Sequence, residues 1–146
     1  MANITVEEIR RLLITKSMTH YNNMDFSGLV LSGLDFSGLT LASSNFSDTR
    51  LIKTKFVTTF LSKCNFQGAN LTEADLTTAI LKEADLSRAT LEKITLSRAN
   101  LYGAIHTGQH EIRKLSGLGP YKSKYNLRIP SWCRSHQSQF DLCYNQ

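Results

Sequence analysis

Three residues near the C-terminal end have side chains that commonly bind zinc in proteins. Cys133 and His136 are separated by two residues, which suits a tetrahedral site, whereas Cys143 lies farther along the chain. A fourth ligand would have to come from a distant residue such as His106 or His110. The sequence therefore predicts no metal site, and Cys133, His136 and Cys143 remain the alternative.

The same segment is basic and aromatic. Basic residues alternate there with aromatic ones, namely Tyr121, Tyr125 and Trp132. This mixture is typical of proteins that bind the phosphate backbone of a nucleic acid and stack aromatic side chains on its bases. No recognised nucleic-acid-binding motif accompanies them. Nucleic-acid or anion binding is therefore kept as an alternative, carried by these basic residues: Lys122, Lys124, Arg128 and Arg134.

The sequence contains no arrangement typical of an active site. No nucleophile is followed by a base and an orienting group at a known spacing, and no glycine-rich phosphate loop is present. Asp and Asn residues are numerous, but they recur at one position of a repeat, which points to a structural role. We therefore expect a protein that is not an enzyme and that needs no cofactor.

The elements that position these residues are set by a repeat of five. A large apolar residue, here called the centre, returns at every fifth position sixteen times in succession, from Phe26 to Leu101. Neither an α-helix, with a period of 3.6, nor a flat strand, with a period of 2, requires this spacing. A fixed short period held over this length is typical of a solenoid.

The residues around each centre predict a short side followed by a corner. The residue two positions before the centre is usually small, and residues two apart on an extended chain face the same way, so both should point inward. The intervening residue is mostly polar and should point outward. The two residues after the centre are rich in Ser, Thr, Gly and charged types, which favour turns.

The order of the centres indicates four sides to a coil. From Phe26 to Phe66 the centres alternate between Phe and Leu, so a coil of twenty residues stacks Phe26 on Phe46 and Phe46 on Phe66. Three sides would instead place Phe26 on Leu41. Like residues stack regularly at the spacing between strands, so we expect about four coils, each rising about 4.8 Å.

The repeats resemble those of the pentapeptide-repeat family. Examples are Ala69-Asn70-Leu71-Thr72-Glu73 and Ala84-Asp85-Leu86-Ser87-Arg88, and the resemblance extends over about residues 24–105. It implies an all-β solenoid, namely a right-handed quadrilateral β-helix. The first coil departs from the family pattern, because these large residues occupy its small inward position: Met24, Leu29, Leu34 and Leu39.

Both ends of such a tube need a cover, because they leave backbone groups and apolar side chains exposed. Thr5 to Glu8 forms a capping-box pattern, and apolar residues follow at helical spacing, which predicts a capping helix over about Val6 to Lys16 within residues 1–23. The repeat ends at His106, which stands where a centre is due. We expect residues 106–146 to form a C-terminal capping segment or a separate tail.

Charge is unevenly distributed between the repeat and the tail. Residues 21–105 carry eight basic and eight acidic side chains, whereas residues 106–146 carry six basic and two acidic ones. No transmembrane segment or signal peptide is apparent, and three cysteines fit a reducing compartment better than a disulfide framework. We expect a cytoplasmic protein, or one exported without a classical signal peptide.

The outward residues of one side suggest a binding surface. Phe60 and Ile80 fall in one column, one coil apart, and Tyr102 lies on the same side. An exposed apolar patch of this kind marks a contact with a protein partner or a second copy, unless the chain's own tail covers it. We therefore expect a non-enzymatic scaffold or interaction module.

The resemblance implies one alternative function. Some members of the family mimic duplex DNA and bind type II topoisomerases. Such mimicry requires a dense negative surface, since DNA carries about one charge per 1.7 Å of its axis. The balanced charge of residues 21–105 disfavours it.

Overall fold

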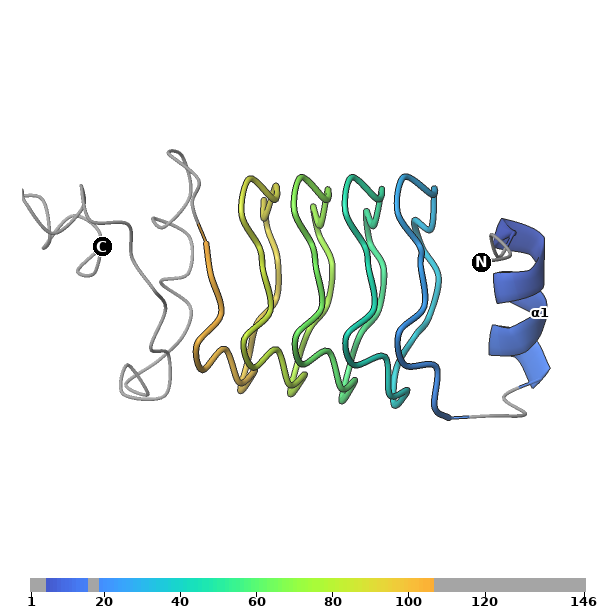
Figure 1. Ribbon diagram of the computed structural model, residues 1–146, viewed down its shortest axis with the longest axis horizontal. Coiled ribbons are helices and arrows are strands. Elements are labelled where there is room, and N and C mark those ends of the chain that lie inside the picture. The colour runs from blue at the N-terminus through green and yellow to red at the C-terminus, as the bar shows by residue number, and fades with distance from the viewer. Residues whose placement is uncertain (1–4, 16–18, 107–146) are drawn as a thin grey trace, which may run out of the picture.

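The described chain forms a stack of coils with one helix at its N-terminal end (Figure 1). The computed structural model describes residues 5–15 and 19–106. The helix, α1, spans Val6–Thr15. In residues 19–106 the β-structure consists of isolated parallel bridges between single residues rather than extended strands. No helix among the described residues is long and apolar enough to span a bilayer.

The bridges give the coil its register. Every recorded bridge joins residues twenty apart, from His20↔Thr40 to Asp85↔Ile105. Four pentapeptides therefore complete one turn, which is the register expected from the alternating Phe and Leu centres. The bridged region begins at His20, slightly before residue 24, where the repeat was expected to start.

Each pentapeptide is held by hydrogen bonds to the coils on both sides. The N–H of the centre Phe46 donates to the carbonyl of Asn65 in the next coil (2.7 Å). The N–H of Asn45 donates to the carbonyl of Met24 in the preceding coil (2.8 Å). Because this pattern recurs around the tube, each coil depends on its neighbours for backbone pairing.

Each corner contains a residue with positive φ, two positions after the centre. Five of these residues are Gly, but twelve are not, and their φ values lie between 53° and 60°. This left-handed conformation is costly for residues other than Gly. Two types of hydrogen bond offset the cost. In the first, the N–H of the positive-φ residue donates to the next coil, as from Lys63 to the carbonyl of Lys82 (2.8 Å). In the second, a side chain within the corner accepts a backbone N–H, as Asn45 Oδ1 does from Ser47 (3.1 Å).

Stacked aromatic rings fill the N-terminal part of the core. Phe26, Phe46 and Phe66 stack in one column, with ring centroids 4.7 Å and 4.9 Å apart. Phe36 and Phe56 stack in the column opposite at 5.3 Å. Rings of the two columns meet edge to face, and all five side chains are buried. The tube is therefore filled by side chains and leaves no channel there.

The small inward residues form a second set of buried contacts. The hydroxyls of Thr49, Thr54 and Thr59 each donate to a backbone carbonyl 23 residues earlier, at 2.8–3.1 Å. The Cys64 thiol continues this pattern with the carbonyl of Leu41 (3.1 Å). Burial raises the pKa of the Cys64 thiol to about 12, so it is a packing residue rather than a nucleophile.

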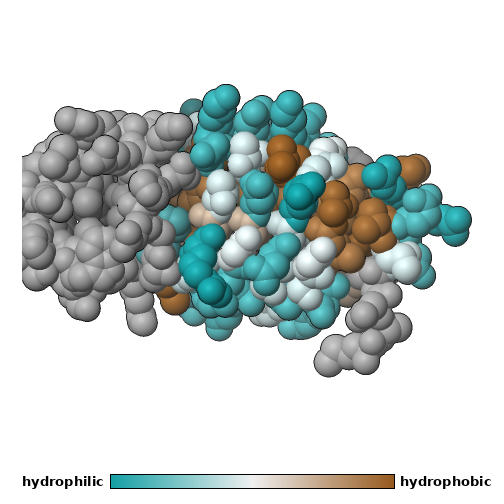
Figure 2. Space-filling model, turned by 90° about the horizontal axis from the view of Figure 1, so that it is seen from above, coloured by the Kyte–Doolittle hydropathy of each residue, from teal (hydrophilic) through white to brown (hydrophobic). Residues whose placement is uncertain are grey.

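The helix α1 lies against the first coil through its apolar face. Its N-terminus is a capping box, in which the N–H of Thr5 donates to Glu8 Oε2 (2.8 Å) and the N–H of Glu8 donates to Thr5 Oγ1 (3.2 Å). Ile9 is buried there, facing Met24 and Leu39 of the first coil. Figure 2 shows hydrophobic atoms gathered where the first coil meets α1.

Candidate functional site

One side of the tube carries adjacent apolar residues on its outer surface. We call it the Phe60 side; its inward centres include Leu41, Leu61, Leu81 and Leu101, and its outward ladder is His20, Thr40, Phe60, Ile80 and Asn100. Phe60 is 47% exposed, Ile80 is half-buried, and a parallel bridge joins them. Tyr102, 56% exposed, lies on the last coil of this side.

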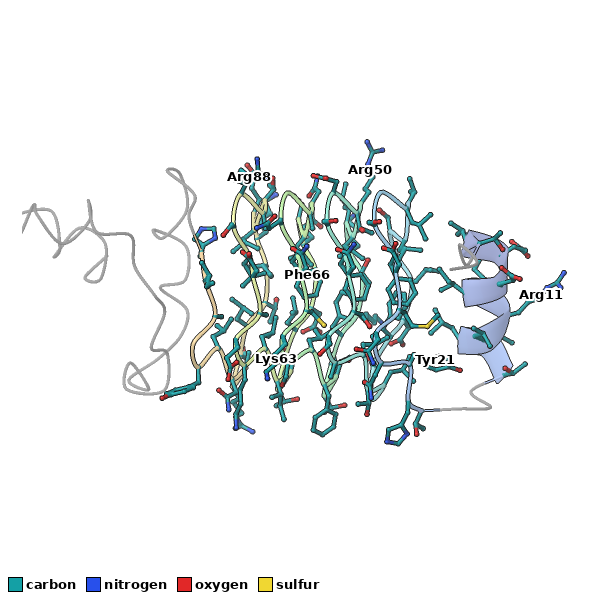
Figure 3. The ribbon with its side chains drawn as sticks, in the orientation of Figure 1. Arg11, Tyr21, Arg50, Lys63, Phe66 and Arg88 are labelled. Atoms are coloured by element: carbon teal, nitrogen blue, oxygen red, sulfur yellow. The ribbon has the colours of Figure 1, made fainter. Side chains whose placement is uncertain are left out.

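Charged residues flank this apolar ladder. Lys63 and Glu83 occupy successive corners of the Phe60 side, with Lys63 Nζ 3.9 Å from Glu83 Oε2. Both side chains are largely exposed, and Lys82 beside them is also exposed. In Figure 3, Lys63 lies in the lower part of the rod, away from the edge that carries Arg50 and Arg88. The only sign of this pair in the sequence is the spacing of twenty residues between Lys63 and Glu83, which places them at the same corner position of successive coils.

The opposite side of the coil lacks such a patch. Its ladder consists of Val30, Arg50, Asn70 and Thr90, so the exposed Val30 has a charged neighbour and no apolar one in the ladder. It does carry an equivalent ion pair, with Lys53 Nζ 3.7 Å from Glu73 Oε2. This side therefore offers a matched reference for experiments on the Phe60 side.

The Asp and Asn column has a structural role. Asp85 Oδ1 accepts the Ser87 N–H (2.9 Å), and its Oδ2 accepts the Gln67 amide (2.8 Å). Burial raises the pKa of the Asp85 carboxyl, but hydrogen bonds from Ser87 and Gln67 and the charge of Arg88 outweigh it and lower the pKa overall. Hydrogen bonds from Ser27 likewise lower the pKa of Asp25. These carboxylates stabilise corners and adjoining coils.

Several residues singled out from the sequence lie outside the described residues. They are the basic residues Lys122, Lys124, Arg128 and Arg134 and the metal alternative Cys133, His136 and Cys143. Within residues 5–15 and 19–106, no group of His, Cys, Asp and Glu could hold a metal ion. His106 fills an inward position at the end of the described coils, where Nδ1 lies 3.1 Å from the carbonyl oxygen of Leu86.

Comparison with known proteins identifies the repeat. The family described as pentapeptide repeats matches residues 44–82 and 79–105, in eight copies. The repeat of residues 44–105 belongs to the pentapeptide-repeat family. The resemblance stated from the sequence is thereby confirmed, and with it the solenoid: pentapeptide-repeat proteins form right-handed quadrilateral β-helices.

The solved structures that resemble this one include two pentapeptide-repeat proteins. A protein of the Arabidopsis thaliana thylakoid lumen is 42% identical, with 57% of each chain covered and a TM-score of 0.56. Rfr23 from the cyanobacterium Cyanothece 51142 is 28% identical, covering 55% of this chain and 54% of its own, with a TM-score of 0.54. The pentapeptide-repeat chain described here thus spans little more than half the length of these relatives. A search of curated proteins finds no match.

Proposed function

We propose that this pentapeptide-repeat protein is a non-enzymatic interaction module that presents its Phe60 side to a protein. The observation that carries the proposal is the contact between Phe60, 47% exposed, and Ile80 in the next coil of a hydrogen-bonded ladder. The coils hold both side chains in place, so little conformational entropy is lost when a partner covers them.

The apolar ladder offers a useful amount of binding energy. An aromatic side chain has about 200 Å² of surface, and burial contributes about 25 cal/mol per Å². Covering the exposed half of Phe60 would therefore contribute about 2 kcal/mol, and Tyr102 a similar amount. Large aromatic residues near the centre of an interface commonly dominate its binding energy.

A photo-crosslinking residue tests this assignment. Benzoylphenylalanine would replace Phe60 in one variant and Val30 in the other, since Val30 is 56% exposed on the opposite side. We expect position 60 to crosslink to protein in the native cell and position 30 to give little product. Equal crosslinking from both positions, or none from position 60, would contradict the proposal.

A paired substitution tests the energetic claim. The double change Phe60→Ser and Ile80→Ser should abolish binding to the crosslinked protein, whereas Val30→Ser should leave it intact. Circular dichroism melting of each variant separates a lost contact from a lost fold, because Ile80 is half-buried. Binding that survives in the folded double variant would show that the Phe60 side is not the interface.

We also infer that the two ends are covered by the chain itself: residues 1–23 at the N-terminal end of the repeat 24–105, and residues 106–146 at the other. The buried Ile9 supports the first part, and the inward position of His106 supports the start of the second. Deleting residues 107–146 should lower the stability of the coils and cause aggregation. A deletion variant as stable and monodisperse as the full chain would contradict the second part.

A further inference from the structure

The Phe60 side is complementary to itself after a half-turn. Consider a two-fold axis that runs along the strand direction between its second and third coils. Rotation about this axis places Phe60 opposite Ile80 of a second copy, and Thr40 opposite Asn100. His20, the first residue of the ladder, then extends past Asn100 and has no counterpart among the described residues. The two apolar residues of the ladder therefore meet at the centre, and the polar ones meet at the rim.

The corner charges obey the same symmetry. Lys63 and Glu83 occupy the second and third corners of this side, and the half-turn places Lys63 of one copy opposite Glu83 of the other. The two ion pairs within the copies would then combine into a square of alternating charge. A parallel arrangement of two rods would instead place these corners at opposite edges of the interface.

Side-chain size follows the symmetry as well. Ala42 lies on the first coil of this side, in the column directly after the centres, and Tyr102 occupies the same column on the last coil. The half-turn brings the small side chain of Ala42 opposite the large, exposed ring of Tyr102. Three independent columns are thus self-complementary about one axis, as an isologous interface requires.

We propose that the Phe60 side binds a second copy of this chain, with the two rods antiparallel. The proposal rests on the proposed function and names the protein that occupies the surface. A second copy is favoured over an unrelated protein because the Phe60 side supplies the partner of each of its own residues. Lys63 meets an opposite charge in Glu83 of the second copy, and Phe60 meets an apolar side chain in Ile80 of the second copy.

The size of the surface sets the strength of association. Four coils with a rise of about 4.8 Å and a side of about five residues give a face of roughly 20 by 16 Å. Such a face buries about 600–1,000 Å² in total, which is below the range of stable complexes. The dimer is therefore weak, with a dissociation constant on the order of 100 µM.

A charge exchange tests both the occupant and the register. In a dimer of Lys63→Glu chains, two acidic residues meet at each contact, and in a dimer of Glu83→Lys chains two basic residues meet. Each single variant should dimerise about tenfold more weakly than the original chain in sedimentation velocity between about 10 and 1,000 µM. An equimolar mixture of the two should recover the original affinity, because every contact between the unlike chains pairs opposite charges.

The opposite side supplies the control. Lys53→Glu and Glu73→Lys change the same type of ion pair and should alter neither self-association nor mixing. Non-specific attraction does not explain recovery, since the net charge of +5 becomes +3 in one variant and +7 in the other, both positive. Melting by circular dichroism establishes that each variant folds.

The outcomes separate this inference from the proposed function. Monomers at all concentrations, or single variants that are not rescued by mixing, would overturn the antiparallel dimer. Crosslinking from position 60 to a different protein would then leave the proposed function in place with another partner. A crosslinked product of twice 16.4 kDa would support both. Self-association that survives Phe60→Ser with Ile80→Ser would overturn the dimer through this side.

Discussion

Replacing Phe46 by Leu tests the register of the core directly. Phe46 is completely buried; it stacks on Phe26 (4.7 Å) and Phe66 (4.9 Å) and meets Phe36 (6.4 Å) and Phe56 (5.9 Å) edge to face. Leu retains most of the apolar volume but removes all four aromatic pairs. Each pair contributes about 0.5–1.5 kcal/mol beyond burial, so Phe46→Leu should lower the free energy of unfolding by at least about 2 kcal/mol.

The end of the same column provides the comparison. Phe26 has two aromatic partners, Phe36 (6.2 Å) and Phe46 (4.7 Å), and Phe26→Leu should therefore cost about half as much. Urea unfolding followed by circular dichroism gives both free energies of unfolding. The m-value, which is the slope of the free energy of unfolding against urea concentration, should stay unchanged if both variants unfold in two states. A Phe46→Leu cost no greater than that of Phe26→Leu would refute the reasoning.

Double-mutant cycles sharpen this test. Phe46 and Phe66 are twenty residues apart and stack with their planes 6° apart, so their coupling energy should be about 1 kcal/mol. Phe26 and Phe66 are separated by the ring of Phe46 and should be additive within about 0.5 kcal/mol. Equal coupling in the two cycles would contradict the twenty-residue coil.

Three further predictions concern the corners, the Asp column and the buried thiol. Thr58→Gly should raise the free energy of unfolding by about 0.5–1 kcal/mol, because a β-branched residue there adopts φ 56°; a loss of stability in urea unfolding would contradict this. Because the folded-state pKa of Asp85 is lowered, its carboxylate adds stability above the unfolded-state pKa of about 3.9, and this is lost as the pH falls through the folded value. Asp85→Asn, which keeps an oxygen acceptor, should flatten the stability profile measured by urea unfolding below about pH 4, and an unchanged profile would remove Asp85 as its cause. Cys64, with a thiol pKa of about 12, should react with iodoacetamide only in unfolding concentrations of urea, so labelling of native protein at the rate of a free thiol, followed by peptide mass spectrometry, would contradict its burial.

The periodic features could be predicted from the sequence because each depends on residue type at a fixed spacing. Alternating Phe and Leu centres indicated the twenty-residue coil, and the bridges from His20 to Ile105 have that register. A helix was predicted over about Val6 to Lys16, and α1 spans Val6–Thr15. Helix ends fray, so a boundary within one residue is as close as a pattern can specify.

Other features depend on geometry that the pattern does not encode. The sequence placed Thr49 and Thr54 inward, but the carbonyls that accept their hydroxyls depend on how far one coil is offset from the next. The positive φ of Lys63 could not be predicted either, because Lys has no preference for that conformation. The backbone hydrogen bond from Lys63 to the next coil imposes it. The roles assigned to Phe60, Ile80 and Tyr102 stay predictions, although their positions on one side follow from the register.

The twenty-residue register also determines how genes of this kind can change in length. Duplicating four consecutive pentapeptides would add one turn and leave every later side chain above its former neighbours. Duplicating a single pentapeptide would rotate everything downstream by a quarter turn. An insertion of five residues between Phe60 and Ile80 would therefore move these two side chains to adjacent faces, even though no residue had been substituted.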